Sequence, residues 1–361
     1  MQKKIIELAV AAAFTVPVMS YAAADVYGIA HVSIDIADNG AEATGTKSSS
    51  ANQLNSNRSR VGLKGSEDLG NGLSAMWQME GTVGMDAGGF SMNRNTFVGL
   101  SSADMGTLVL GRHDTPYKIS TRKLDVFKDT AADNRDSGML SGHDARLNNV
   151  IAYISPDFSG LTVAVASTFD AENATTSTAP NADKKAQVIS LAGMYSRDNI
   201  YATLAYQGIK AGSGTTTTGQ SNIPGTMALD DESNALKFGG GYTMDQFTVN
   251  AFIESLTDKT VAAPATETTG TNVYLGATFA VSETDAVKLA YTQRGEATTT
   301  TSGAPDTKVK KGSQISIGYD HDMSKNTRVY ALYSAVTDDA GVGVTAAADP
   351  TVISFGIKHS F

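Results

Sequence analysis

Apolar and polar residues alternate with a period of two along most of the chain. Within residues 247–254, Phe247, Val249 and Ile253 share one parity, whereas Asn250 shares the other with Glu254. The same alternation recurs in three further segments, residues 273–281, 287–294 and 353–361. Because successive side chains of a β-strand point to opposite faces, the pattern predicts strands with one apolar face and one polar or small-residue face.

The predicted strands are joined alternately by short polar turns and by long loops rich in Thr, Ala, Gly and Asp. They number sixteen, near residues 25–36, 57–64, 72–81, 93–101, 106–112, 147–155, 160–168, 186–195, 200–209, 234–243, 246–255, 271–281, 285–294, 312–320, 326–335 and 351–361. Solvated long loops are predicted at residues 37–56, 170–185, 211–233, 258–270, 296–311 and 336–350. Lipid tolerates no open sheet edge, so an even number of such strands predicts an all-β fold, a 16-stranded antiparallel transmembrane β-barrel with short periplasmic turns and long extracellular loops.

The N-terminus has the pattern of a secretory signal peptide. Lys3 and Lys4 precede an apolar run from Leu8 to Met19, which is shorter than the roughly 20 residues that a spanning helix needs. Small residues follow, with suitable cleavage positions after Ala22 or Ala24. We therefore expect residues 1–24 to be a signal peptide and residues 25–361 to form a single β-barrel domain in the outer membrane.

Composition narrows the function classes. The 361 residues contain no cysteine, which excludes a disulfide scaffold and thiolate chemistry. A formal net charge of −9 argues against nucleic acid as a partner. Alternation alone also fits a soluble sandwich, so a secreted or surface β-sheet adhesin or binding module without a pore stays open as the alternative.

Several motifs resemble those of the general porins of Gram-negative outer membranes, with the neisserial-type trimeric porins most similar. They are NRSRVGLKGSEDLGNGL at 57–73, MWQME at 76–80, NRNTFVGL at 93–100, GTLVLGR at 106–112 and YISPDFSGL at 153–161. The final Phe361 fits the family's C-terminal membrane-insertion signature. The resemblance implies a homotrimer in contact with lipid and lipopolysaccharide. Each barrel would allow passive, size-limited diffusion of small hydrophilic solutes and ions through a water-filled pore.

The longest predicted loop, residues 113–146, is expected to fold inward and narrow that pore. Asp114-Thr115-Pro116 provides a capping residue and a first-turn proline, which predicts a short helix beginning near Tyr117 and extending toward Phe127. A loop folded into the lumen would present its acids to the barrel wall: Asp125, Asp129, Asp133 and Asp136.

The resemblance places arginines on the inner wall opposite the loop, at Arg60, Arg94, Arg112 and Arg146. Arg58 and Lys64 share the parity of Arg60 and extend this basic wall. Arg112 shares the parity of Leu108 and Leu110, so an inward Arg112 requires a β-bulge. Basic wall residues favour anions, whereas the acidic loop and net charge favour cations, and the sequence leaves the selectivity open.

Catalysis has little support in the sequence. The five histidines are scattered and show no metal-ligand spacing, so we expect no metal site and no cofactor. Ser141 and His143 lie close together in the long loop, but such adjacency is weak support for a hydrolase. The sequence therefore predicts a general diffusion porin that is not an enzyme.

Overall fold

The computed structural model describes residues 24–38, 50–135, 139–168, 186–211, 227–228, 230–309, 311–338 and 349–361. The first half of the sheet comprises β1 (Asp25–Asp38), β2 (Ser50–Ser56), β3 (Arg60–Gly70), β4 (Leu73–Val83), β5 (Phe90–Ser91), β6 (Thr96–Ser102), β7 (Gly106–Asp114), β8 (Arg146–Ile154), β9 (Leu161–Thr168) and β10 (Gln187–Arg197). The second half comprises β11 (Ile200–Lys210), β12 (Glu232–Met244), β13 (Phe247–Thr260), β14 (Thr266–Ala280), β15 (Asp285–Arg294), β16 (Ala297–Thr301), β17 (Thr307–Val309), β18 (Gly312–Asp322), β19 (Thr327–Asp338) and β20 (Thr351–Ser360).

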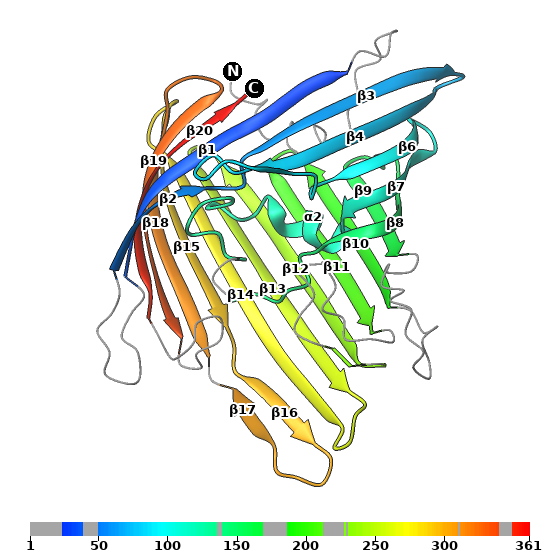
Figure 1. Cartoon of the computed structure of the whole chain (residues 1–361), viewed down its shortest axis with the longest axis vertical. Helices are drawn as coiled ribbons and strands as arrows, with labels where there is room; N and C mark the ends of the chain where they lie inside the picture. The colour runs from blue at the N-terminus through cyan, green and yellow to red at the C-terminus, as the bar shows by residue number, and fades with distance from the viewer. Residues whose placement is uncertain are drawn as a thin grey trace.

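These strands form a closed antiparallel barrel (Figure 1). Neighbouring wall strands pair in chain order, and β1 pairs with β20 from Ile29 opposite Ser360 to Asp38 opposite Thr351. Both β2 and β3 pair with β1, so they are two parts of one wall strand. With β2 and β3 counted as one strand, and with the short β5 and the β16–β17 hairpin left out, the described wall has sixteen strands, which confirms the predicted fold class.

Three predicted loops contain strands instead. The segment 37–56 includes β2, and β13 and β14 extend into the segment 258–270. In the segment 296–311, β16 pairs with the outer end of β14 and β17 pairs with β16, forming the hairpin that projects from the barrel in Figure 1. The Thr-rich sequence predicts a solvated loop, and this prediction is wrong for 297–301, because threonine suits a paired strand once a neighbouring edge is present.

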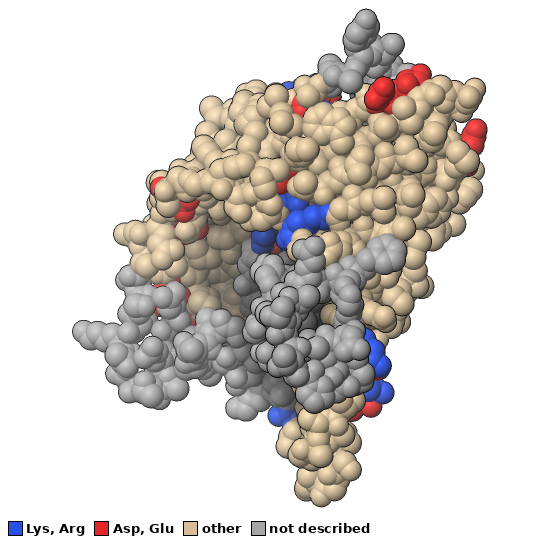
Figure 2. Space-filling model, turned by 45° about the vertical axis from the view of Figure 1, so that its right-hand side comes forward, with Lys and Arg blue, Asp and Glu red and all other residues tan. Residues whose placement is uncertain are grey.

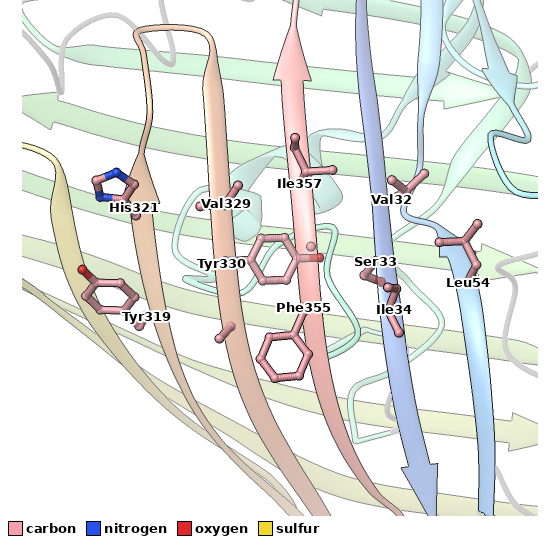
Figure 3. A pocket seen from close by; sticks show the side chains of 12 residues that line it. Val32, Ser33, Ile34, Leu54, Tyr319, His321, Val329, Tyr330, Phe355 and Ile357 are labelled. Atoms are coloured by element: carbon pink, nitrogen blue, oxygen red, sulfur yellow. The ribbon is translucent and has the colours of Figure 1, made fainter.

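The barrel wall is apolar outside and polar inside. Along β13, Val249 and Ile253 are 53% and 46% exposed, whereas Phe252 and Glu254 on the other parity are buried. Figure 3 shows outward side chains of β18, β19, β20, β1 and β2 around a groove on this outer face, among them Phe355 and Ile357. A large exposed apolar surface around a buried polar interior is the arrangement of a barrel surrounded by lipid.

Tight turns join strands at one end of the barrel. Asn71 and Gly72 connect β3 to β4 with positive φ angles, and Asp198 and Asp245 adopt the same left-handed conformation in later turns. Such residues suit two-residue hairpins because their backbone twist matches that of the flanking strands. No helix among the described residues is long and apolar enough to cross a membrane.

The lumen holds α2 (Pro116–Arg122) and the other described residues of the loop between β7 and β8, 123–135 and 139–145 (Figure 1). Thr115 caps the helix by accepting a hydrogen bond from the backbone N–H of Lys118 at 3.3 Å, and Pro116 occupies its first turn, as predicted. The helix ends at Arg122 rather than near Phe127. Asp125 accepts the backbone N–H of Phe127 at 2.9 Å, and this local turn replaces further helix.

The hydrophobic core lies between this loop and the inner wall rather than inside a sandwich. Tyr117, Leu124 and Phe127 are fully or almost fully buried. They join one cluster with Phe252 of β13 and Tyr274 of β14, whose rings stack with centroids 4.9 Å apart. Buried apolar surface therefore holds one face of the loop against the barrel.

Candidate functional site

The acids of the loop are paired mainly with arginines of the loop itself. Arg122 lies 2.7 Å from Asp129 and 2.6 Å from Asp133, and it also reaches Asp125 at 3.3 Å. Arg135 lies 3.1 Å from Asp133. Neither Arg122 nor Arg135 was predicted from the sequence as a site residue. The spacing contained a signal, because Asp125 follows Arg122 by three positions and the next two aspartates, Asp129 and Asp133, follow at intervals of four.

Two basic residues of the wall reach the same acids. Arg58 occupies the break between β2 and β3 with a positive φ angle, and its Nε lies 3.6 Å from Asp129. Arg60, the first residue of β3, places Nη1 3.5 Å from Asp129. The structure thus brings Asp129 against both Arg58 and Arg60. Of the sequence-predicted wall arginines, Arg60 meets a predicted loop acid directly.

Arg94 and Arg146 are held by acids of the wall. Arg94 forms an ion pair with Glu80, which also accepts a hydrogen bond from the Tyr27 hydroxyl at 2.9 Å. Arg146 lies 3.0 Å from Asp114, the last residue of β7. Both guanidinium groups are therefore fixed in place, and their charges are partly balanced.

Arg112 lies at an irregularity of the wall. The register of β7 against β8 shifts between Gly111 and His113, and Gly111 has a φ of 142° that suits glycine. An inward Arg112 was predicted to require a β-bulge, and the register shift lies at that residue. The guanidinium of Arg112 donates to the carbonyl oxygen of Asn93 at 2.9 Å and to the side chain of Asn148. Within the part of the chain that the structure describes, Arg112 forms no ion pair with a loop acid.

The remaining predicted residues lie apart from these contacts. Lys64 is exposed and lies over the ring of Tyr27, with Nζ 5.4 Å from the ring centroid. Asp136 and the predicted signal peptide through residue 23 lie outside the described residues. Phe361 exchanges backbone hydrogen bonds with Gly28 at 2.9 and 3.1 Å, and its side chain is exposed on the barrel.

Burial and neighbouring charges shift the pKa values of the loop acids in different directions. Burial, reinforced by Asp133, raises the pKa of Asp125 to about 6. Burial also opposes ionisation of Asp129 and Asp133. The nearby cations, Arg122 foremost, outweigh it and hold both pKa values well below the usual range.

Loop lysines respond to the same surroundings. Reduced hydration lowers the pKa values of Lys118, Lys123 and Lys128 to about 8. Lys118 keeps a partner, since its Nζ lies 2.8 Å from Asp114. Lys128 is exposed to the lumen and has nearby Arg122 and Arg60 as like-charge neighbours. These lysines are the groups of the loop that lose charge just above neutral pH.

Basic side chains outnumber acidic ones around the described part of the loop. The basic set is Arg58, Arg60, Arg94, Arg112, Lys118, Arg122, Lys123, Lys128, Arg135, Arg146, Lys237, Lys288 and Lys358. The acidic set is Glu80, Asp114, Asp125, Asp129, Asp133, Asp144, Glu254 and Asp320. Figure 2 shows Lys and Arg side chains gathered in a hollow of the molecule. Charges of one sign in such a hollow raise the local concentration of ions of the opposite sign.

The loop does not assemble a hydrolytic site from Ser141 and His143. The Ser141 hydroxyl donates to Glu254 at 2.7 Å, whereas Nε2 of His143 lies 3.1 Å from the hydroxyl of Ser233. Among the described residues, no group of three or more His, Asp and Glu side chains could hold a metal ion.

The closed barrel, its inward loop and its apolar outer face can be compared with known proteins. Residues 8–341 match the family described as Gram-negative porin. The chain belongs to this family. Outer membrane porin protein 32 of Delftia acidovorans is 28% identical over 389 residues and matches 100% of both chains. Major outer membrane protein P.IA of Neisseria meningitidis serogroup C is 38% identical over 107 residues, which is 29% of this chain and 27% of that protein.

Solved structures show the same fold. The anion-selective porin from Comamonas acidovorans superposes with a TM-score of 0.74 at 24% sequence identity, covering 94% of this chain and 100% of that one. The protein is thus an outer-membrane porin, a passive diffusion channel and not an enzyme, as the sequence predicted. The alternative of an adhesin without a pore is not supported.

Proposed function

We propose that this porin prefers anions and that its selectivity arises where the loop 113–146 faces Arg58, Arg60, Arg94 and Arg146. The observation that carries the proposal is the pairing of Asp129 and Asp133 with Arg122 and Arg135. The loop neutralises its own acids to a large extent. The wall arginines therefore contribute a surplus of positive charge at the narrow part of the lumen.

Local charge dominates ion selectivity because salt screens distant charge. The Debye length is about 8 Å at physiological ionic strength, so acids at the barrel rims act weakly on an ion inside the lumen. Guanidinium groups stay protonated at any working pH, and their reduced hydration suits repeated contact with small carboxylates and phosphates. The overall charge of −9 is thus a poor guide to this channel.

The structural relative from Comamonas acidovorans is described as anion-selective, and that description agrees with the proposal. The deciding test is the reversal potential of the purified protein in a planar bilayer under a salt gradient. If the channel prefers anions, the reversal potential has the same sign as the equilibrium potential of chloride. A potential of the opposite sign would contradict the proposed role of the wall arginines.

We also propose that the protein assembles as a homotrimer. Trimers occur among its relatives, since OmpT of Vibrio cholerae is described in a trimer form. The apolar outer face includes the groove at β20, β1 and β2, which offers surface for a second copy (Figure 3). Conductance steps in groups of three, together with a cross-linked trimer band, are the expected result. Single steps from a verified monomer would contradict it.

A further inference from the structure

We infer that Glu254 of β13 and Lys237 of β12 are positioning residues that latch both ends of the loop to the wall and hold the channel at one size. The inference rests on the proposed role of the loop as the constriction. Glu254 and Lys237 lie directly opposite each other in the sheet, and both side chains are fully buried. We call these two residues and their loop partners, Tyr117, Thr121, Ser141 and Asp144, the buried latch.

Glu254 gathers donors from three segments of the chain. The hydroxyl of Tyr117 donates to Oε1 at 2.7 Å, from the first turn of α2. Ser141 donates its hydroxyl to Oε1 at 2.7 Å and its backbone N–H to Oε2 at 2.9 Å. Asn272 of β14 donates to Oε2 at 2.8 Å. One carboxylate therefore ties the beginning and the end of the loop to the same point of the wall.

Lys237 completes this arrangement from the neighbouring strand. Its Nζ lies 2.8 Å from Asp144 and 3.6 Å from Glu254, and it donates to the hydroxyl of Thr121 at 3.3 Å. The same ammonium group lies 4.2 Å from the ring centroid of Tyr117. Asp144 and Thr121 belong to opposite ends of the loop, so Lys237 joins the same two segments as Glu254.

A buried charge is costly unless partners surround it, and removing one partner leaves the others uncompensated. The two wall residues and their loop partners should therefore hold or release the loop as a unit. Away from the latch, the loop extends to Asp129, which meets Arg60 on β3. Release at the latch would let that segment move relative to the wall arginines and change the width of the channel.

The isosteric substitution Glu254→Gln tests the latch with little change of volume. An amide in place of Oε2 sets an NH2 group against the N–H of Ser141 and the NH2 of Asn272, which cannot pair donor to donor. In the other orientation the NH2 can donate to the hydroxyls of Tyr117 and Ser141, which rotate to accept it. In either orientation the substitution removes the negative charge that lies 3.6 Å from Nζ of Lys237. Adding Asn272→Asp returns an acceptor and the lost charge, so the double variant should restore the latch.

The cysteine-free chain makes docking of the loop directly measurable. Ser120 on α2 is fully buried, and its hydroxyl donates to the carbonyl of Tyr117 rather than to the latch. A Ser120→Cys reporter can be probed with a small neutral maleimide, whose access does not depend on ion selectivity. We expect slow modification in the reporter alone and modification at least about tenfold faster with Glu254→Gln or Lys237→Met, because a broken buried pair favours opening.

Single-channel recording of the same variants provides the second measurement. Each pore of the reporter protein should show one stable open level, whereas each pore of Glu254→Gln should switch between levels, and Glu254→Gln with Asn272→Asp should return to one level per pore. Asp285→Asn is the matched control, since Asp285 accepts hydrogen bonds from Ser282, Thr284 and Tyr319 at the barrel end, away from the loop.

Unchanged labelling and a single open level in correctly folded Glu254→Gln and Lys237→Met proteins would overturn the inference. If Lys237→Met does not fold, Glu254→Gln and its rescue decide alone. A wild-type channel that prefers cations would refute the proposed selectivity and leave the labelling result intact. The two proposals can thus fail separately.

Discussion

The two faces of the loop between β7 and β8 differ in how they meet the barrel. The packed face, formed by Tyr117, Leu124 and Phe127, is buried against the inner wall. The charged face, formed by Arg122, Asp129, Asp133 and Arg135, contacts Arg58 and Arg60 of the wall. The packed face holds the loop against the wall, and we propose that the charged face sets which ions pass it.

Magnitudes support this division. Burying a large apolar side chain stabilises by about 1.5–3 kcal/mol. The contacts of the wall residues Arg58 and Arg60 with Asp129 are long, at 3.6 and 3.5 Å, and Arg58 remains partly exposed to water, so they contribute less. Substitutions on the packed face should therefore change the position of the loop and the conductance. Substitutions of Arg58 and Arg60 should change selectivity while the loop stays in place.

The largest effect is expected for Leu124→Asp on the packed face. Leu124 is almost fully buried, and a carboxylate there loses its hydration without gaining a hydrogen-bond donor or a cation as partner. The loop should detach, with a higher or unstable single-channel conductance in planar bilayers. Lys128→Asp is the control, because it introduces the same side chain at an exposed position of the same loop. A stable wild-type conductance in Leu124→Asp would count against the packed face as the anchor.

Removing Arg58 and Arg60 together should have the next largest effect. Arg58→Ser with Arg60→Ser deletes the two wall charges that meet Asp129, so the reversal potential should shift toward cations. The conductance should keep a single level, because the packed face is untouched. Lys64→Ser is the control on the same strand and should shift the potential less. Equal shifts would show that the loop-facing arginines have no special role.

Selectivity should also depend on pH. Lys118, Lys123 and Lys128 have pKa values lowered to about 8, so they lose protons as the pH rises from 7 to 9. Protonation of Asp125, with a pKa raised to about 6, removes a negative charge as the pH falls from 7 to 5. Both changes make the lumen more positive at lower pH, and anion preference should fall steadily from pH 5 to pH 9.

Reversal potentials across this pH range provide the measurement. Lys128→Arg should reduce the slope of the profile between pH 7 and pH 9, because one of the three lysines is replaced by an arginine that does not titrate there. A profile that rises with pH would contradict the assigned signs.

The smallest effect is expected at the helix cap. Thr115→Ala removes the side-chain acceptor for the N–H of Lys118 at a cost of about 1 kcal/mol. Maleimide modification of the Ser120→Cys reporter should then be roughly fivefold faster, less than with Glu254→Gln. Thr115→Ser keeps the hydroxyl and should behave as the parent. An unchanged rate in Thr115→Ala would show that the cap does not contribute to docking.

Much of the fold could be predicted from residue order alone. The period-two alternation located the wall strands because each strand must present alternate side chains to lipid and lumen. Thr115 and Pro116 marked the start of α2 for local reasons that need no tertiary contact. The paired segments at 258–270 and 296–311 were missed, because a polar Thr-rich stretch becomes a strand only when a neighbouring edge accepts it.

The candidate site was predictable in part. Arg60 and Asp129 were both identified in advance, and the structure places them 3.5 Å apart. The self-pairing of the loop through Arg122 and Arg135, and the partners of Glu254 and Lys237, could not be read from the chain. They depend on which way the loop folds within the lumen.

The sequence by itself determined the barrel. Each membrane-spanning strand must present apolar side chains to lipid and polar or small ones to the lumen, and the period-two alternation meets this requirement within each strand. Tertiary structure alone decided the charge balance of the lumen and the attachment of the loop. Those properties depend on distances between residues far apart in the chain, such as Tyr117 and Glu254 at 2.7 Å. Electrostatic and hydrogen-bond energies fall steeply over a few ångströms, so composition cannot replace geometry there.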